Sequence, residues 1–178
     1  MIHTVGHGNR TIEEFMGLLR EAGIGCLVDV RAYPASRRHP HFSQEALGRS
    51  LAEAGVRYVW EGRALGGRRQ AVKASPHVGL RNPAFRAFAD HMATQDFRDG
   101  IARLVELARA APAAIMCAER LPWRCHRFLI SDYLAAGGER VIHLVSAGAQ
   151  REHRLSAAAR LQEGNLVYDG ETQRELTL

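Results

Sequence analysis

The fold is decided by residues 2–30, which read IHTVGHGNRTIEEFMGLLREAGIGCLVDV. An apolar run at 2–6 precedes Thr11-Ile12-Glu13-Glu14, the capping-box pattern in which a hydroxyl and a carboxylate satisfy free amides at a helix start. Apolar residues then recur at helical spacing as far as Gly23, which ends the helix. The run from Cys26 to Val30 is apolar except for Asp29, as expected for a strand covered on both faces. The segment therefore predicts a strand–helix–strand unit.

The alternation of strands and helices continues beyond residue 30. Strands are predicted at 2–6, 26–30, 56–60, 113–117 and 140–145, and helices at 12–22, 43–55, from 82 onward, at 97–108 and at 122–136. This order implies right-handed crossovers and a parallel sheet. We predict an α/β fold with three layers, in which a mostly parallel sheet of about five strands carries helices on both faces.

The chain of 178 residues favours a single domain, and no linker or repeat divides it. The tail, 149–178, is expected to pack on this domain or to extend it. Within the tail we predict a helix around Glu152 to Leu161 and a short strand from Leu166 to Tyr168.

Composition narrows the class of protein. Hydrophobic residues make up 46% and charged residues 24%, which is ordinary for a globular protein. No apolar run is long enough to span a bilayer, and the first residues lack the pattern of a secretory signal. Three cysteines are too few for a disulfide framework. We therefore expect a cytoplasmic protein with no membrane partner, and the sequence requires no cofactor.

The formal net charge is +5, and arginine supplies nearly all of the basic residues. Such a bias can simply follow the base composition of a genome, so the clustering of the arginines matters more than their number. Two loops carry paired arginines, Arg37-Arg38 and Arg68-Arg69. Each pair can be a solvated loop, but two such loops at one sheet edge favour an anionic ligand.

Polar side chains follow the carboxyl ends of the predicted strands, where ligands bind in sheets of this kind. Those ends carry most of the reactive residues of the chain. The candidate catalytic residues are Cys117, Glu119, Asp29 and Cys125, and the candidate substrate- or anion-binding residues are His7, Asn9, Arg31, Ser36, Arg37, Arg38, Arg68, His126 and Arg127.

The fourth crossover, Cys117-Ala118-Glu119-(x)5-Cys125-His126-Arg127, is the most informative segment. Cys117 should lie at a strand tip, and Cys125 to Arg127 in the first turns of the next helix, where free amides attract anions and favour a thiolate. Glu119 can orient an arginine, accept a proton or bind a sugar hydroxyl. Both cysteines can equally be core residues. The Cys-x7-Cys-His spacing is not a standard zinc spacing, so no metal site is predicted.

Asp29 interrupts a buried strand, so its carboxylate must be paired or hydrogen-bonded. One interpretation is a salt bridge to a nearby arginine that holds the loops together. Another is a base, or an acceptor for a ribose or an amine. His7, between two glycines, can contact a ligand or can be a turn histidine with its bonds satisfied.

The motifs TVGHGNR, LVDVRAYPASRR, LGGRR, and MCAE followed by CHR, in this order, resemble the bacterial and archaeal family called domain of unknown function 488 (DUF488). The likeness extends over nearly the whole chain, including the tail around His153 and Tyr168. It implies an α/β fold and a shared polar site built from these motifs, without naming a reaction. Many members carry serine where this chain has Gly8, so that hydroxyl is not available here.

Three functions compete. The first is an enzyme, a hydrolase or a transferase, acting on an anionic, phosphate- or nucleotide-containing small molecule. The second is a domain that binds or processes nucleic acid, with the arginine loops on the backbone and exposed aromatics such as Tyr33 and Trp123 stacking on bases. The third is a thiol or metal sensor that uses Cys117, Cys125 and His126. The sequence does not predict an oligomeric state.

Overall fold

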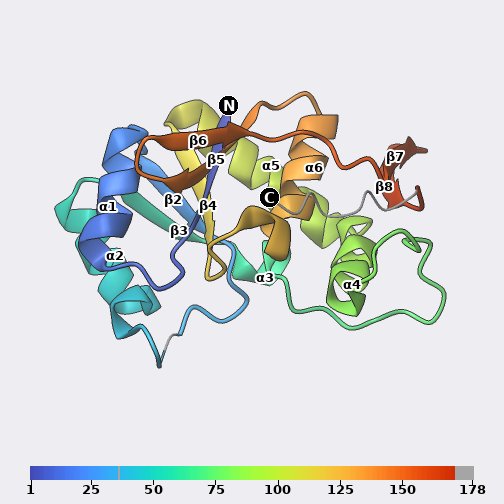
Figure 1. The fold of residues 1–178 in the computed structure, drawn as a ribbon, viewed down its shortest axis with the longest axis horizontal. Coiled ribbons are helices and arrows are strands. Elements are labelled where there is room, and N and C mark those ends of the chain that lie inside the picture. The colour runs from blue at the N-terminus through green and yellow to red at the C-terminus, as the bar shows by residue number, and fades with distance from the viewer. Residues whose placement is uncertain (36, 171–178) are drawn as a thin grey trace.

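The computed structural model describes residues 1–35 and 37–170, and it places a six-stranded sheet at the centre of the molecule (Figure 1). The strand order is β3-β2-β4-β1-β5-β6; the first five run parallel, and β6 runs antiparallel to β5. The strands are β1 (Ile2–Gly6), β2 (Cys26–Asp29), β3 (Arg57–Trp60), β4 (Ala113–Cys117), β5 (Val141–Ser146) and β6 (Ala149–Glu152). The predicted α/β fold is confirmed, with one strand more than expected.

Helices cover both faces of this sheet, which gives the expected three layers. The helices are α1 (Ile12–Glu21), α2 (Gln44–Glu53), α3 (Gly62–Leu65), α4 (Pro83–Met92), α5 (Gln95–Ala110) and α6 (Arg127–Ala136), with short 3-10 helices η1 (Pro40–Phe42) and η2 (Pro122–Arg124). In Figure 1, α1 and α2 lie to the left of the sheet and α5 and α6 to the right.

Apolar side chains separate into two cores, one on each face of the sheet. Phe15 of α1 and Leu47 of α2 pack on Leu27 of β2, while Leu104 of α5 and Leu129 of α6 belong to the other core. Neighbours on a strand alternate between the cores, because successive side chains point to opposite faces. The near-continuous apolar runs of the sequence follow from this double burial.

Helix caps confirm the start that the sequence predicts for α1. The Thr11 hydroxyl accepts a hydrogen bond from the Glu14 amide at 3.2 Å, and the Glu14 carboxylate accepts one from the Thr11 amide at 2.9 Å. Asn82 caps α4 with its side-chain oxygen, which accepts from the Ala84 amide at 2.9 Å, and Pro83 stands in the first turn, where its missing amide proton costs nothing. Local sequence therefore fixes where these helices begin.

The helix predicted from Pro122 to Ala136 begins later than expected. Residues Pro122–Arg124 form the 3-10 helix η2, and Cys125 then takes an extended conformation (φ −135°, ψ 147°) that no α-helix can continue through. Only from Arg127 does the α-helix run. The prediction for 122–126 was wrong, and the kink in the chain determines where Cys125 lies.

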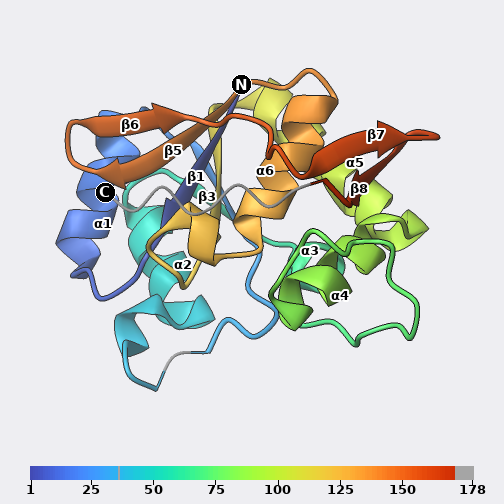
Figure 2. The ribbon, with the colours of Figure 1, turned by 45° about the vertical axis from the view of Figure 1, so that its right-hand side comes forward.

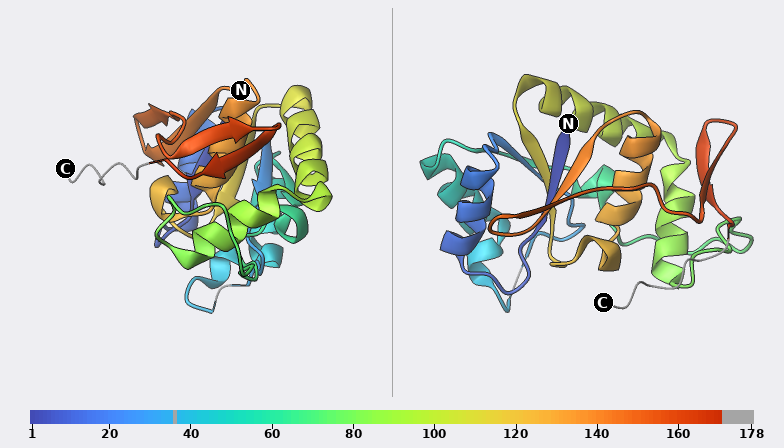
Figure 3. Two further views of the ribbon diagram at one scale, coloured as in Figure 1. Left: turned by 90° about the vertical axis from the view of Figure 1, so that its right-hand side faces the viewer. Right: turned by 45° about the horizontal axis from the view of Figure 1, so that its top comes forward.

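The helix predicted over 152–161 was also wrong. This region contains the end of β6, a loop, and β7 (Ala159–Gln162), which pairs with β8 (Asn165–Tyr168) in a separate hairpin. Leu155 and Leu161 are exposed, so this stretch has no buried apolar face of the kind that an amphipathic helix presents. The strand predicted at 166–168 is confirmed. The hairpin lies beyond α6 and packs on α4 (Figures 2 and 3).

Across residues 1–35 and 37–170, no helix combines the length and the apolar composition that crossing a membrane requires.

Candidate functional site

A cavity of about 1030 Å³ lies at the carboxyl ends of β1, β2 and β4. Four loops and the start of α4 form its walls. They contribute His7, Gly8 and Asn9; Arg31, Ala32, Tyr33, Ala35, Arg38 and His39; Gly67 and Arg68; Ala84 and Phe85; and Cys117 to Arg120 with Arg124, Cys125 and His126. This is the edge of the sheet at which the sequence predicts a site.

The loops after β1 and β4 are bound to one another. The His7 amide donates to the Cys117 carbonyl at 3.0 Å, and the Gly8 amide donates to the Ala118 carbonyl at 2.8 Å. Gly6 permits this approach, because a Cβ there would lie 1.9 Å from the carbonyl oxygen of Glu119. The GHGNR motif thus supports the loop segment that begins at Cys117.

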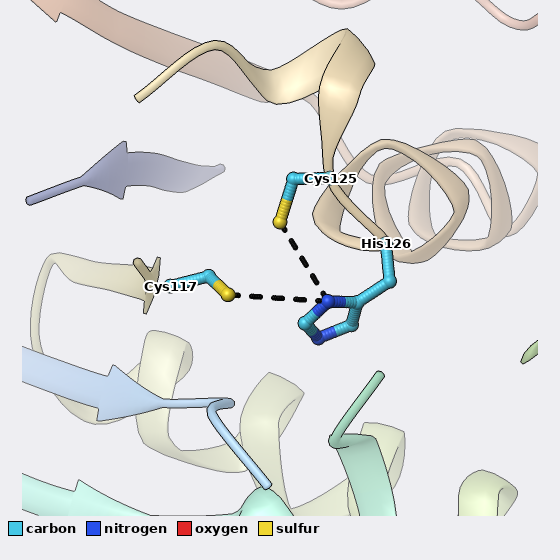
Figure 4. A group of neighbouring side chains, drawn as sticks. All are labelled: Cys117, Cys125 and His126. Atoms are coloured by element: carbon cyan, nitrogen blue, oxygen red, sulfur yellow. Dashed lines mark hydrogen bonds between the residues drawn. The ribbon is translucent and has the colours of Figure 1, made fainter. Parts of the chain in front are cut away.

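Cys117, Cys125 and His126 form a compact cluster in the cavity wall (Figure 4). His126 Nδ1 lies 3.9 Å from Cys117 Sγ and 3.6 Å from Cys125 Sγ, and both sulfurs point at the ring. The 3-10 helix η2 turns the chain back so that Cys125 meets Cys117, which ends β4. The arrangement follows from the extended conformation of Cys125, which delays the start of the predicted helix to Arg127.

The ring of His126 is fixed from its far side. Its Nε2 lies 3.2 Å from the carbonyl oxygen of Val30, at the end of β2, so Nε2 carries the proton and Nδ1 presents a lone pair to the thiols. Phe88 packs edge to face against the His126 ring, with the two ring centroids 5.0 Å apart. A Cβ at Gly67 would lie 2.5 Å from Nδ1, so only glycine fits beside the imidazole.

The two thiols differ in acidity. The hydrogen bond to Cys125, followed by burial, raises the pKa of the Cys117 thiol well above its ordinary value. Burial opposes ionisation of Cys125 as well, but the hydrogen bond from Cys117 and the positive charge of Arg127 act against it, and the pKa of Cys125 lies below its ordinary value. The pair therefore favours one thiol and one thiolate, with the negative charge on Cys125.

Arginines dominate the charge of the cavity, because Arg31, Arg38, Arg68, Arg120 and Arg124 all line it. Arg31 is buried, and its guanidinium binds the fully buried carboxylate of Asp29 at 2.6 Å. Burial opposes its charge, but the hydrogen bonds and the charge of Asp29 raise the pKa of Arg31. The Tyr58 hydroxyl donates to the same carboxylate at 2.7 Å. Asp29 is thus the partner of Arg31, as the salt-bridge interpretation predicts.

His7 presents a buried acceptor to the cavity. Its Nδ1 donates to the Gly8 carbonyl at 2.9 Å, and its ring stacks on Phe42 with centroids 4.3 Å apart. Burial lowers the pKa of His7 to about 4, although the bond to Gly8 opposes this, so the ring is neutral near pH 7. Within residues 1–35 and 37–170, no group hydrogen-bonds its buried Nε2.

Most of the predicted site residues meet in this cavity. Those that line it are His7, Asn9, Arg31, Arg38, Arg68, Cys117, Glu119, Cys125 and His126. Asp29 lies beneath the wall, Arg37 is exposed beside it, and Ser36 falls outside the described residues. Glu119 is exposed at the rim.

Arg127 has a different setting from the anion-binding role predicted for it. It is fully buried, and its guanidinium donates to the Glu119 carbonyl and to Thr4 Oγ1. From Thr4 a buried chain of hydrogen bonds continues through His143 Nδ1 (2.8 Å), His143 Nε2 to His153 Nδ1 (3.0 Å), and His153 Nε2 to Asp132 (2.8 Å). Arg127 therefore links the loop that carries Glu119 to the tail.

Four further residues line the cavity: Tyr33, which the sequence suggested as a stacking aromatic, and His39, Arg120 and Arg124, which were not among the predicted catalytic or anion-binding residues. Each lies within the two loops that the sequence marked as functional. Their position in those loops was the available signal, whereas their side-chain directions depend on how the loops fold.

The model of the family described as domain of unknown function DUF488 matches residues 11–134. The GHGNR motif and the tail lie outside the matched range. No curated protein matches the chain, and no solved structure matches it. Most of the chain, including both arginine loops and the Cys117–Cys125–His126 cluster, falls within the match, and the protein belongs to the DUF488 family.

Proposed function

We propose that the protein is an enzyme, a hydrolase or a transferase, that acts on an anionic, phosphate- or nucleotide-containing small molecule in this cavity. One observation carries the proposal: the Cys117–Cys125–His126 cluster and five arginines share the walls of a single cavity. A reactive cluster with no binding surface beside it would not favour an enzyme, and neither would a basic surface with no reactive cluster.

The balance of charge favours an anion. Among the lining residues, Glu119 carries the single carboxylate, against the five guanidinium groups. Arginine binds phosphate through two parallel hydrogen bonds, which a compact ammonium group cannot provide. Arg31 is held rigidly by Asp29, whereas Arg38 and Arg124 are exposed and can adjust to a ligand.

Two further features suit a nucleotide. Tyr33 is 70% exposed at the cavity, and the guanidinium of Arg68 lies 5.4 Å from its ring centroid. An exposed aromatic ring beside a cation offers a stacking surface for a base. The buried Nε2 of His7, which no group within residues 1–35 and 37–170 hydrogen-bonds, suits a hydroxyl or an amino group of the ligand.

The roles of the predicted catalytic residues follow from their places. Cys117 and Cys125 form the reaction centre with His126, and Glu119 at the rim binds a hydroxyl or accepts a proton. Asp29 positions Arg31 rather than touching the substrate. A cytoplasmic location suits this account, because reducing conditions preserve the thiols.

Anion binding is tested with a matched pair of arginines. Phosphate, nucleotides and sugar phosphates are screened for an increase in melting temperature, and the dissociation constant of each hit is measured by calorimetry. Arg38→Ala should weaken binding about tenfold to a hundredfold, since a charged hydrogen bond contributes about 1.5–3 kcal/mol. Arg37→Ala removes the same charge outside the cavity and should bind as the wild type does. Equal losses in both variants would mean that net charge, not the cavity, binds the anion.

A nucleic-acid ligand is the second candidate, because Tyr33 and the exposed arginines could also follow a single strand. Short oligonucleotides in the same screen separate the two. Binding that is limited to oligonucleotides and falls steeply with salt would replace the small-molecule proposal.

A further inference from the structure

The Cys117–Cys125–His126 cluster has the geometry of a metal centre. All three donor atoms lie within 4.8 Å of one another, and His126 Nδ1 lies 3.6 and 3.9 Å from the two sulfurs. In a tetrahedral zinc site with Zn–S near 2.3 Å and Zn–N near 2.0 Å, neighbouring sulfur and nitrogen ligands are about 3.6 Å apart. The cluster therefore needs only a small adjustment to enclose an ion.

The surroundings of His126 strengthen this comparison. A histidine that binds metal through one nitrogen usually donates the other N–H to a carbonyl or carboxylate, which fixes the ring and makes the ligand more basic. The bond from His126 Nε2 to the Val30 carbonyl is of this kind. The close packing of Gly67 keeps Nδ1 directed at the sulfurs.

The donor set selects the type of ion. Two thiolates and an imidazole suit Zn²⁺, whereas Mg²⁺ and Ca²⁺ prefer oxygen. Three protein ligands leave the fourth position of a tetrahedron open, as in catalytic rather than structural zinc sites. All three residues line the cavity, so the open position faces the space where the anion is proposed to bind.

We propose that Cys117 Sγ, Cys125 Sγ and His126 Nδ1 bind one Zn²⁺ ion whose fourth coordination position faces the cavity. Two Zn–S bonds and one Zn–N bond form, and any proton remaining on the sulfurs is released to solvent. The fourth position takes water or an oxygen atom of the substrate. Only the assignment to substrate rests on the proposed function; the metal site stands on its own geometry.

The first measurement is the metal content of protein stripped with a chelator, reloaded with Zn²⁺ under reducing conditions and desalted. We expect about one zinc per chain. Cys117→Ser, Cys125→Ser and His126→Gln should each lower retention at least about tenfold. Cys26→Ala removes the third cysteine, which lies in β2 away from the cluster, and should keep the full content. Melting curves exclude variants that do not fold.

A second readout uses Co²⁺ in place of zinc on the wild-type protein. Thiolate-to-cobalt charge-transfer absorption together with the strong visible bands of tetrahedral Co²⁺ is expected, and Cys26→Ala should give the same spectrum. Folded wild-type protein that retains no zinc and shows no such bands would overturn the proposal. A Cys117–Cys125 disulfide that resists the reductant and is still present after reloading would overturn it as well, because neither sulfur would then be free to bind zinc.

The metal and the anion can fail separately. Arg38→Ala should bind zinc normally and bind the anion more weakly. Protein that binds the anion but never zinc would refute the metal site and leave the proposed function intact. Protein that binds zinc but no anion would refute the proposed function and leave the metal site intact.

Discussion

The carbonyl oxygen of Val30, at the end of β2, holds the imidazole of His126 through Nε2 at 3.2 Å, although the two residues are 96 positions apart. This contact determines which nitrogen faces the thiols. Because Nε2 is the donor, Nδ1 is left to accept a thiol proton or to bind a metal ion. The parallel sheet therefore acts directly on the chemistry of the cluster, since it places the end of β2 beside the start of α6.

Gly67→Ala tests whether the position of the ring matters. A Cβ would lie 2.5 Å from His126 Nδ1, so the imidazole must move. Zinc affinity measured by chelator competition should fall about tenfold to a hundredfold. Gly48→Ala in α2 adds the same methyl group where no atom outside the backbone of its own helix turn lies within 4 Å, and it should leave the affinity unchanged. Equal affinities in the two variants would contradict this packing.

Tyr58→Phe tests the support of Arg31. The Tyr58 hydroxyl donates to the fully buried carboxylate of Asp29 at 2.7 Å, and a lost hydrogen bond to a buried charge costs about 1–3 kcal/mol. The free energy of unfolding in urea should decrease by that amount. Tyr33→Phe removes a hydroxyl from an exposed ring and should change it by less than about 0.5 kcal/mol. If Tyr58→Phe unfolds like the wild type, the bond contributes nothing.

Asp29→Asn should be more damaging, because it leaves the guanidinium of Arg31 buried without its counter-charge. Breaking a buried ion pair on one side costs about 3–5 kcal/mol. The urea midpoint should fall further than in Tyr58→Phe, and anion binding should weaken as Arg31 loses its fixed position. A midpoint unchanged from the wild type would show that Asp29 is not needed to hold Arg31.

The buried histidine His143 makes stability depend on pH. Burial, followed by the charges of His153, Arg127 and Arg151, lowers its pKa from 6.5 to about 3. Below pH 6.5 the unfolded chain takes up a proton that the folded protein refuses, so this contribution is fully present above pH 6.5 and is lost as the pH falls toward 3. Through this group, the free energy of unfolding falls by up to about 1.4 kcal/mol for each unit that the pH decreases. Urea unfolding of His143→Gln should show a shallower decline than the wild type over this range; parallel curves would contradict the assignment.

The parallel sheet was predictable because a strand that is buried on both faces has a nearly continuous apolar sequence, as in Cys26 to Val30 and Ala113 to Cys117. The helix starts at Thr11 and Asn82 were predictable because capping depends on neighbours in the chain. The carboxyl ends of the strands then indicated the site without any knowledge of side-chain geometry. These three steps use only local or topological information.

The tail was not predictable in the same way. Leu155, Ala158 and Leu161 have helix-like spacing, but Leu155 and Leu161 are exposed, and only the pairing with β5 and β8 decides the strands. A local signal existed at Glu163-Gly164, where both residues have positive φ (49° and 78°) in a two-residue hairpin turn. Gly164 is typical of such a turn, but Glu163 is not, because asparagine, aspartate or glycine is the usual residue at a first turn position with positive φ.

The metal-like cluster was hidden for a different reason. The seven residues between Cys117 and Cys125 do not match a zinc spacing, and the predicted helix would have turned Cys125 toward the core. The extended conformation of Cys125 after η2 brings the sulfurs together. The chain Arg127–Thr4–His143–His153–Asp132 was equally hidden, because its members come from distant parts of the sequence.

Turnover of an anionic ligand by the cluster tests the central claim most directly. The purified protein, loaded with zinc, is incubated with a phosphate- or nucleotide-containing compound that binds in the screen, and products are followed by mass spectrometry. The wild type and Cys26→Ala should convert it at equal rates, and Cys125→Ser should bind it but convert it at least about a hundredfold more slowly. Conversion by Cys125→Ser at the wild-type rate would contradict a reaction centre at this cluster.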